Sequence, residues 1–241
     1  MPELPDGLNI TWFGHSTMRI ETPSGKRILI DPFLNDNPKC PDDLKDPGPL
    51  DAILVSHGHF DHIADAVSIA QKTGAPVVGI VELVHALNAQ GAEEVVEFNK
   101  GGTVEVAGVK VHMTHAVHTT GVPNPDGGHE LYGGEPAGLV IELEDGFKIY
   151  HAGDTAVFSD MDIIGKLLAP DLAMLPIGDH YTMGPRSAAF AINLLKVKQV
   201  IPIHYGTFPV LTGTPDQLRK EADGIEGLQV VAMDPGQTIG N

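Results

Sequence analysis

The stretch Ala52–His62, AILVSHGHFDH, decides the fold: a continuous apolar run leads directly into three histidines and an aspartate. Such a short apolar run is typical of a strand buried on both faces. His57 and His59 stand two residues apart, so they project the same way from an extended loop and can reach one metal ion. Asp61 and His62 lie where the chain turns into a helix, where their side chains can reach a second ion. The stretch therefore predicts a metal site beyond a buried strand.

Two later strands end in residues of the same chemistry. Phe147–His151 runs into a Gly-Asp-Thr turn that contains Asp154, whose two carboxylate oxygens are suited to bridging two cations. Gln199–Ile203 runs into His204, which places an imidazole at a strand terminus. Each feature alone is more typical of an ordinary turn or a buried histidine. Together with the first stretch, they favour a ligand set assembled from several strand ends.

A further imidazole is expected at the end of the strand Val109–Thr114, where His115 and His118 are both candidates and we choose His118. Imidazole and carboxylate donors suit zinc, manganese and iron. We expect two divalent metal ions per chain, zinc or manganese, with iron also compatible with these donors.

The rest of the chain predicts two sheets packed together with helices outside, because a β-rich half is followed by strand and helix alternation that is repeated once. One helix is expected over Asp61–Lys72, and a last strand over Leu228–Met233 closes the chain. Asn35–Asp51, rich in Pro, Asp and Lys, is expected to be a surface loop that holds Cys40. The Gly- and Pro-rich stretch Gly121–Gly138 is a candidate lid.

Composition narrows the class of protein. The 241 residues fit one domain, residues 1–241, and the net charge of −17 disfavours nucleic acid and anionic membranes as partners. The single cysteine, Cys40, implies no internal disulfide, and we find neither a signal peptide nor a membrane span. We expect a cytoplasmic protein with a small-molecule substrate, able to form a homo-oligomer.

These residues resemble the metallo-β-lactamase superfamily, whose signature is His-x-His-x-Asp-His followed by a lone His, a bridging Asp and a final His. The resemblance covers nearly the whole chain and implies an α+β fold, a four-layer αββα sandwich with the site at one edge of the two sheets. It implies a first metal held by His57, His59 and His118, a second held by Asp61, His62 and His204, and Asp154 bridging both. Asp31 matches an early acidic motif that supports ligands without touching metal.

A narrower resemblance is to small metal-dependent hydrolases similar to L-ascorbate 6-phosphate lactonase. It rests on Trp12–Ser16 (WFGHS), Ala152–Thr155 (AGDT), Leu175–Gly178 (LPIG), Thr182–Pro185 (TMGP) and Pro202–Gly206 (PIHYG). RNA-processing and thioesterase members of the superfamily carry added domains for which this chain has no room. The resemblance therefore implies a small-molecule substrate.

The implied function is hydrolysis of an ester, lactone or phosphodiester by a hydroxide that two metal ions share, since two cations lower the pKa of a bound water to near neutrality. Asp61 would orient the nucleophile while acting as a ligand. His15 and His180 are the further catalytic candidates; His180, or its neighbour Tyr181, would protonate a leaving group. Arg186, near a helix start, is a candidate for binding an anionic substrate.

An alternative of another class is a non-catalytic metal-binding or scaffolding protein on the same fold. Proteins of that kind usually lose ligands, and all seven implied ligands are present here. The sequence therefore favours the enzyme.

Overall fold

Two sheets of seven strands each form the centre of the protein, which a computed structural model describes over residues 3–240. The first sheet contains, in spatial order, β14 (Thr238–Gly240), β1 (Asn9–Trp12), β2 (Met18–Glu21), β3 (Arg27–Ile30), β4 (Ala52–Leu54), β5 (Val77–Ile80) and β6 (Val95–Phe98). The second contains β13 (Gln229–Val230), β12 (Gln199–Ile203), β11 (Leu172–Pro176), β10 (Lys148–His151), β9 (Ala137–Glu142), β8 (Val109–His115) and β7 (Thr103–Val106).

Both sheets change from antiparallel to parallel pairing along their length. β1 to β3 pair antiparallel and β3 to β6 parallel in the first sheet, and β7 to β10 and β10 to β13 repeat this plan in the second. Parallel neighbours need crossover connections, which are mostly helical here. The helices are α1 (Phe60–Ile63), α2 (Ala66–Thr73), α3 (Val81–Ala89), α4 (Met161–Leu167), α5 (Pro185–Leu195), α6 (Pro215–Glu221) and the 3₁₀ turn η1 (Asp42–Leu44).

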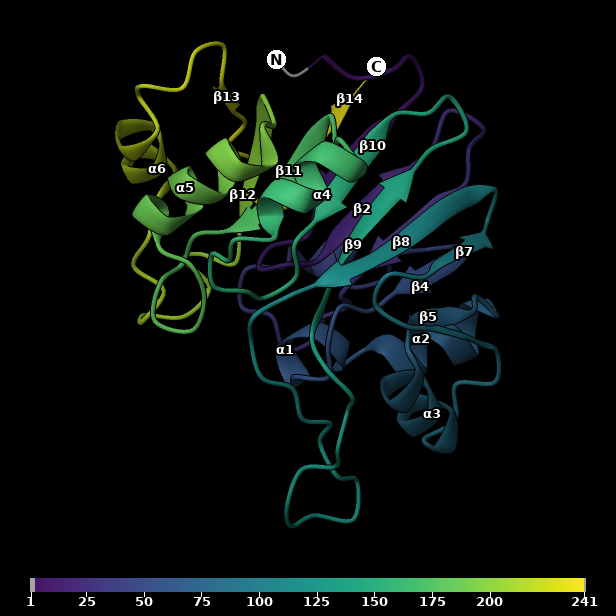
Figure 1. Cartoon of the computed structure of the whole chain (residues 1–241). Helices are drawn as coiled ribbons and strands as arrows, with labels where there is room; N and C mark the ends of the chain where they lie inside the picture. Colours follow the sequence, from purple (N-terminus) through teal and green to yellow (C-terminus); the bar gives the residue numbers. More distant parts are fainter. Residues whose placement is uncertain (1–2, 241) are drawn as a thin grey trace.

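Helices cover the outer faces of the two sheets, as Figure 1 shows, with α2 and α3 on one side and α4, α5 and α6 on the other. The expected α+β sandwich of four layers is confirmed. β11 illustrates why its strands are continuous apolar runs: Leu172 and Met174 pack into the core between the sheets, while Ala173 and Leu175 pack into the core beneath α4 and α5. All four side chains are fully buried, so both faces of the strand are apolar.

The single helix expected over Asp61–Lys72 is wrong, because the chain forms α1 and α2 with a break at Asp65. The Asp65 carboxylate accepts hydrogen bonds from the backbone N–H groups of Leu34 at 2.6 Å and Asn35 at 3.1 Å. The Asp65 N–H donates to the carbonyl of Pro32 at 3.1 Å. These contacts with a distant loop hold the residue outside helical geometry.

The closing strand expected over Leu228–Met233 is also wrong, since only β13 forms there. The chain then crosses to the first sheet, where β14 pairs antiparallel with β1. Nor does Asn35–Asp51 lie wholly on the surface: Cys40 and Leu50 are 6% and 8% exposed and belong to the core between the sheets. The polar composition of the stretch does not reveal that these two residues are buried.

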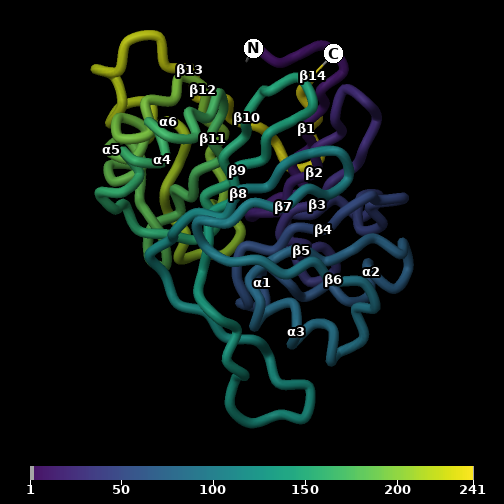
Figure 2. Tube along the Cα trace, turned by 45° about the vertical axis from the view of Figure 1, so that its right-hand side comes forward, coloured from purple at the N-terminus to yellow at the C-terminus, as the bar shows by residue number. Residues whose placement is uncertain are grey.

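The candidate lid protrudes from the body of the protein between β8 and β9 (Figures 1 and 2). Its base is tied by an antiparallel bridge in which Val122 and Leu131 exchange backbone hydrogen bonds of 2.9 and 2.8 Å. Residues 137 and 138, expected within the lid, are already part of β9. Within residues 3–240, none of the helices has the length and apolar character needed to cross a membrane.

Candidate metal centre

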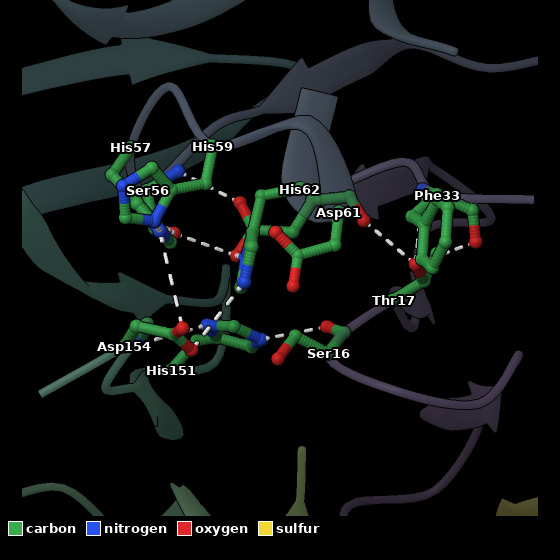
Figure 3. Close-up of polar contacts among 12 residues, drawn as sticks. Ser16, Thr17, Phe33, Ser56, His57, His59, Asp61, His62, His151 and Asp154 are labelled. Atoms are coloured by element: carbon green, nitrogen blue, oxygen red, sulfur yellow. Dashed lines mark hydrogen bonds and ion pairs between the residues drawn. The ribbon is translucent and has the colours of Figure 1, made fainter. Parts of the chain in front are cut away.

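The seven predicted ligands come together from four connections at the carboxyl ends of strands. The loop after β4 carries His57 and His59, α1 carries Asp61 and His62, and the loops after β8, β10 and β12 carry one ligand each. Figure 3 shows part of this cluster, with His57, His59 and His62 gathered near Asp154. The first sheet therefore supplies four donors and the second sheet three.

One group of donors consists of imidazoles. His57 Nε2 lies 3.0 Å from His59 Nδ1, and His118 Nε2 lies 3.3 Å from the same atom. One nitrogen from each ring lies within 4.8 Å of the others. The other candidate, His115, is exposed and its Nδ1 lies 3.1 Å from Lys100 Nζ, so the structure brings His118 and not His115 to the cluster.

A second group contains His15, Asp61, His62 and His204, which also offer donor atoms within 4.8 Å of one another. His204 Nε2 lies 3.9 Å from Asp61 Oδ2, and His15 Nε2 lies 3.0 Å from the same oxygen. Sequence reasoning named His15 as a catalytic candidate but did not include it among the ligands. The His15 and His204 rings lie 4.0 Å apart between centroids, and this contact arises from tertiary packing.

Asp154 lies between the two groups. Its Oδ2 is 3.9 Å from His57 Nε2 and 3.6 Å from His118 Nε2 on one side, and 3.1 Å from His204 Nε2 on the other. Its Oδ1 is 3.4 Å from His62 Nε2. This is the placement expected of a carboxylate that bridges two cations.

Several buried polar atoms at the centre of the cluster have no hydrogen-bond partner among the described residues. They are His62 Nε2, Asp154 Oδ1 and both ring nitrogens of His204. A buried polar atom left unpaired costs about 1–3 kcal/mol. A divalent cation bound by these nitrogen and oxygen atoms would remove that cost. The residues present therefore fit a metal site.

Electrostatics also prepares the donors. Burial lowers the pKa of His57 well below its usual value, which favours the neutral imidazole that a metal requires. Burial alone would raise the pKa of Asp154, but the nearby His204 and His62 outweigh it and hold that pKa well below its usual range. For Asp61 the opposing effect of burial is likewise outweighed, chiefly by the hydrogen bond from His15, and its pKa is lowered. Both carboxylates are therefore ionised at neutral pH.

Asp31, expected to support ligands, lies behind His62. Its Oδ2 accepts from His62 Nδ1 at 2.8 Å and from the Ser56 hydroxyl at 2.6 Å, and its Oδ1 accepts from the Ser56 N–H at 2.7 Å. The bond to Nδ1 leaves Nε2 of His62 as the nitrogen directed to the cluster. Asp31 thus fixes both the orientation and the tautomer of a donor ring.

His151 plays a similar part for Asp154. Its Nε2 donates to the carbonyl of Ser16 at 3.0 Å, and its Nδ1 accepts from the N–H of Gly153 at 3.2 Å. The ring is fully buried and is held neutral, since burial lowers its pKa. It fixes the turn that carries Asp154 without reaching the cluster as a donor.

The other catalytic candidates occupy different places. His15 is fully buried, with Nδ1 2.9 Å from the Thr207 hydroxyl and Nε2 bound to Asp61. His180 is exposed in a turn with positive φ of 61° and packs edge-on against Tyr181, and it is Tyr181 that lines the cavity. Arg186 does not line this cavity; it lines a separate cleft with Asp179 and Glu221.

A cavity of about 480 Å³ opens in front of the cluster. Its lining combines donor residues with apolar and aromatic side chains: His59, Phe60, Asp61, His118, Thr119, Glu130, Asp154, Tyr181, His204, Phe208 and Val210. Sequence reasoning missed Glu130, Phe208 and Val210. No local signal marks them, since they follow no motif and reach the cavity only through the fold.

A four-layer sandwich with histidines and aspartates clustered at one sheet edge defines a protein of the metallo-β-lactamase fold. Residues 26–205 match the family model of the beta-lactamase superfamily domain. Metal-dependent hydrolases of Rubrobacter xylanophilus and Koribacter versatilis are 53% identical over 241 residues and 51% identical over 232 residues, covering 99% of both chains in the first case and 96% and 97% in the second.

A solved structure agrees with these sequence matches. Igni18, a metallo hydrolase from Ignicoccus hospitalis, superposes with a TM-score of 0.83 at 34% identity and covers 96% of this chain and 97% of its own. The chain belongs to the beta-lactamase superfamily domain family, and it is a metal-dependent hydrolase.

Proposed function

We propose that this chain holds two divalent metal ions and hydrolyses an ester, lactone or phosphodiester bond in a small molecule. The observation that carries the proposal is the position of Asp154 between the two donor groups. His57, His59 and His118 would hold one ion, and Asp61, His62 and His204 the other. Zinc and manganese suit these donors, as does iron.

When bound, the two ions would supply activation of water at neutral pH and polarisation of the oxygen at the scissile bond. The chain itself orients the reacting groups. His15 donates from Nε2 to Asp61 Oδ2 and holds this carboxylate at the edge of the cavity, ionised and able to orient a water. The Thr207 hydroxyl is hydrogen-bonded to the other ring nitrogen of His15. Thr207 therefore orients the His15 ring, and the ring in turn orients the Asp61 carboxylate.

Apolar and aromatic side chains form much of the cavity wall. Phe60, Phe208, Val210 and Tyr181 line the cavity. The phenol of Tyr181 is the group in this wall that is suited to donating a proton to a leaving alcohol. Tyr181 therefore takes the part that the sequence suggested for His180 or its neighbour. We also propose a cytoplasmic location, in keeping with a lone thiol that needs no oxidising compartment.

The experiment is metal analysis combined with a substrate panel. We expect two ions per chain in zinc- or manganese-loaded protein, and hydrolysis of bis(p-nitrophenyl) phosphate or of simple lactones and esters. His57→Ala and His204→Ala should each lose metal and activity, whereas His85→Ala, which replaces a histidine outside the cluster, should lose neither. A folded, fully loaded protein that hydrolyses no member of the panel would favour the non-catalytic metal-binding or scaffolding alternative.

A lactone related to L-ascorbate 6-phosphate belongs to this panel because of the sequence resemblance, and it tests whether the substrate is an anion. The charges around the cavity favour a cationic substrate instead.

A further inference from the structure

The wall of the cavity in front of the candidate metal centre is apolar and exposed. Phe60, Tyr181 and Val210 are 54%, 59% and 41% exposed, and they line the cavity together with Phe208. Large apolar side chains that remain exposed around one cavity are typical of a surface that binds an apolar group. The remote part of a substrate would therefore be a hydrocarbon or aromatic group.

Positive side chains are missing from this wall. Among the residues that the structure describes, no lysine or arginine lines the cavity. Arg186, the residue that the sequence suggested for anion binding, lines a separate cleft. An anionic substrate group away from the metal ions would meet no partner here, and the net charge of −17 would repel it further.

One negative side chain outside the donor cluster does line the cavity, and this is Glu130. None of the ion pairs among residues 3–240 includes Glu130, so its carboxylate is not neutralised by the protein. It stands next to Leu131, whose backbone is tied to Val122 by the two hydrogen bonds at the base of the loop. The bridge thus holds the backbone beside Glu130 at the cavity.

Gly121 makes room for this carboxylate. A Cβ atom at position 121 would lie 2.1 Å from Glu130 Oε2 and 2.9 Å from its Cδ, closer than atoms can approach. The backbone of Gly121 is not in the left-handed region, so what a Cβ would disturb here is the Glu130 side chain packed against it. A residue larger than glycine at position 121 would displace the Glu130 carboxylate from its present place.

We propose that the substrate carries an apolar group, bound by the aromatic wall, and a positively charged group, bound by Glu130. This inference rests on the proposed function and names its substrate class: an amphiphilic cationic ester or lactone. For an ester, one water is consumed, the acyl C–O bond breaks, the acyl carbon gains the hydroxyl, and the alcohol leaves with a proton. The acid formed in this way releases a proton to water at neutral pH, and the cationic group of the substrate takes no part in the bond changes.

The test compares three p-nitrophenyl esters of equal acyl length that end in a methyl, a trimethylammonium or a carboxylate group. For wild-type protein we expect kcat/KM about fivefold higher for the trimethylammonium ester than for the methyl ester, and about fivefold lower for the carboxylate ester, the size expected of an exposed ion pair. Glu130→Gln should bring the ratio of cationic to neutral ester close to one. Gly121→Ala, which displaces the carboxylate, should reduce the same ratio.

Asp126→Asn is the matched control, because it removes a carboxylate from the same loop at a residue that does not line the cavity. The ratio of cationic to neutral ester should be unchanged in this variant. Equal rates for all three esters, or a preference for the carboxylate ester, would overturn the inference while leaving the hydrolase proposal intact.

A binding measurement separates the two proposals further. Hexyltrimethylammonium and hexanoate are titrated into metal-loaded protein by calorimetry, with wild type and Glu130→Gln side by side. Tighter binding of the cation that is lost in Glu130→Gln supports the cavity's charge preference even if no ester is hydrolysed. Tighter binding of hexanoate contradicts it.

Discussion

The hydrogen bonds around Asp31 predict that Asp31→Asn weakens metal binding without removing a ligand. The two oxygens of Asp31 accept from three donors, the N–H and hydroxyl of Ser56 and Nδ1 of His62. An amide placed with nitrogen at the Oδ2 position makes Nδ1 an acceptor, which moves the ring proton to Nε2, the nitrogen 3.4 Å from Asp154 Oδ1. The opposite placement sets an amide N–H against the Ser56 N–H.

Both placements have a cost, and only the first keeps the backbone contact. Loss of a residue that orients a metal-bound histidine typically weakens metal affinity about 10–100-fold, or about 1.4–2.8 kcal/mol. We expect a decrease of this size for one ion, measured by competition with a chromophoric chelator. The ion count at saturating metal should remain that of wild type.

Asp65→Asn is the matched control, since Asp65 is also a buried carboxylate that accepts from three donors, on Leu34 and Asn35, but contacts no metal-site residue. Both variants should lower the free energy of unfolding of the metal-free protein by about 1–3 kcal/mol. Only Asp31→Asn should weaken metal binding. Wild-type affinity in Asp31→Asn, or equal weakening in both variants, would show that tautomer control by Asp31 is not the cause.

Three more outcomes follow from the structure. His118→Ala should lose metal and lower kcat/KM at least about 100-fold, whereas His115→Ala should keep wild-type metal content by elemental analysis; the reverse result would move the ligand to residue 115. Burial raises the pKa of Cys40 to about 11, so its reaction with a disulfide reagent near pH 8 should be at least about 10-fold slower than in denatured protein and should rise with pH. A rate that does not depend on pH would contradict this. Thr214→Ala removes a capping box in which the Thr214 hydroxyl accepts from the N–H of Gln217 and the Gln217 side chain accepts from the N–H of Thr214. The substitution should lower the free energy of unfolding by about 1 kcal/mol, measured by urea denaturation. An unchanged urea midpoint would contradict this.

Much of the fold can be predicted from short-range patterns because its strands carry their own signal. Gln199–Ile203 forms a strand with the predicted bounds, and the strands predicted over Val109–Thr114 and Phe147–His151 are found within one residue of those bounds. In these segments the apolar, branched residues and the flanking turn residues act within a few positions of each other. The αββα arrangement follows from the order of such elements and is confirmed.

The elements that sequence reasoning misplaced depend on distant partners. Asp65 breaks a helix because a loop thirty residues earlier donates hydrogen bonds to it. β14 forms because β1 offers it an edge to pair with, and its three residues, one of them Gly240, are too few to show a strand pattern of their own. Periodicity within a window cannot report either contact.

The site divides in the same way. His57, His59, Asp61 and His62 form a motif whose spacing predicts metal chemistry directly. Glu130, by contrast, belongs to no motif and reaches the cavity through a two-residue bridge in a protruding loop. Residues that would hold the ions are visible in the sequence, whereas residues that would select the substrate are visible only in three dimensions.

Because the donors are divided between the two sheets, the stability of the folded chain depends on the supply of a metal ion. Neither sheet alone has a full set of donors, so an ion bound by donors from both sheets would oppose their separation. Free ion at a hundred times its dissociation constant adds about 2.7 kcal/mol to the stability of a protein that binds it only when folded. A cell short of that ion would therefore lose the protein to unfolding and proteolysis, as well as its activity.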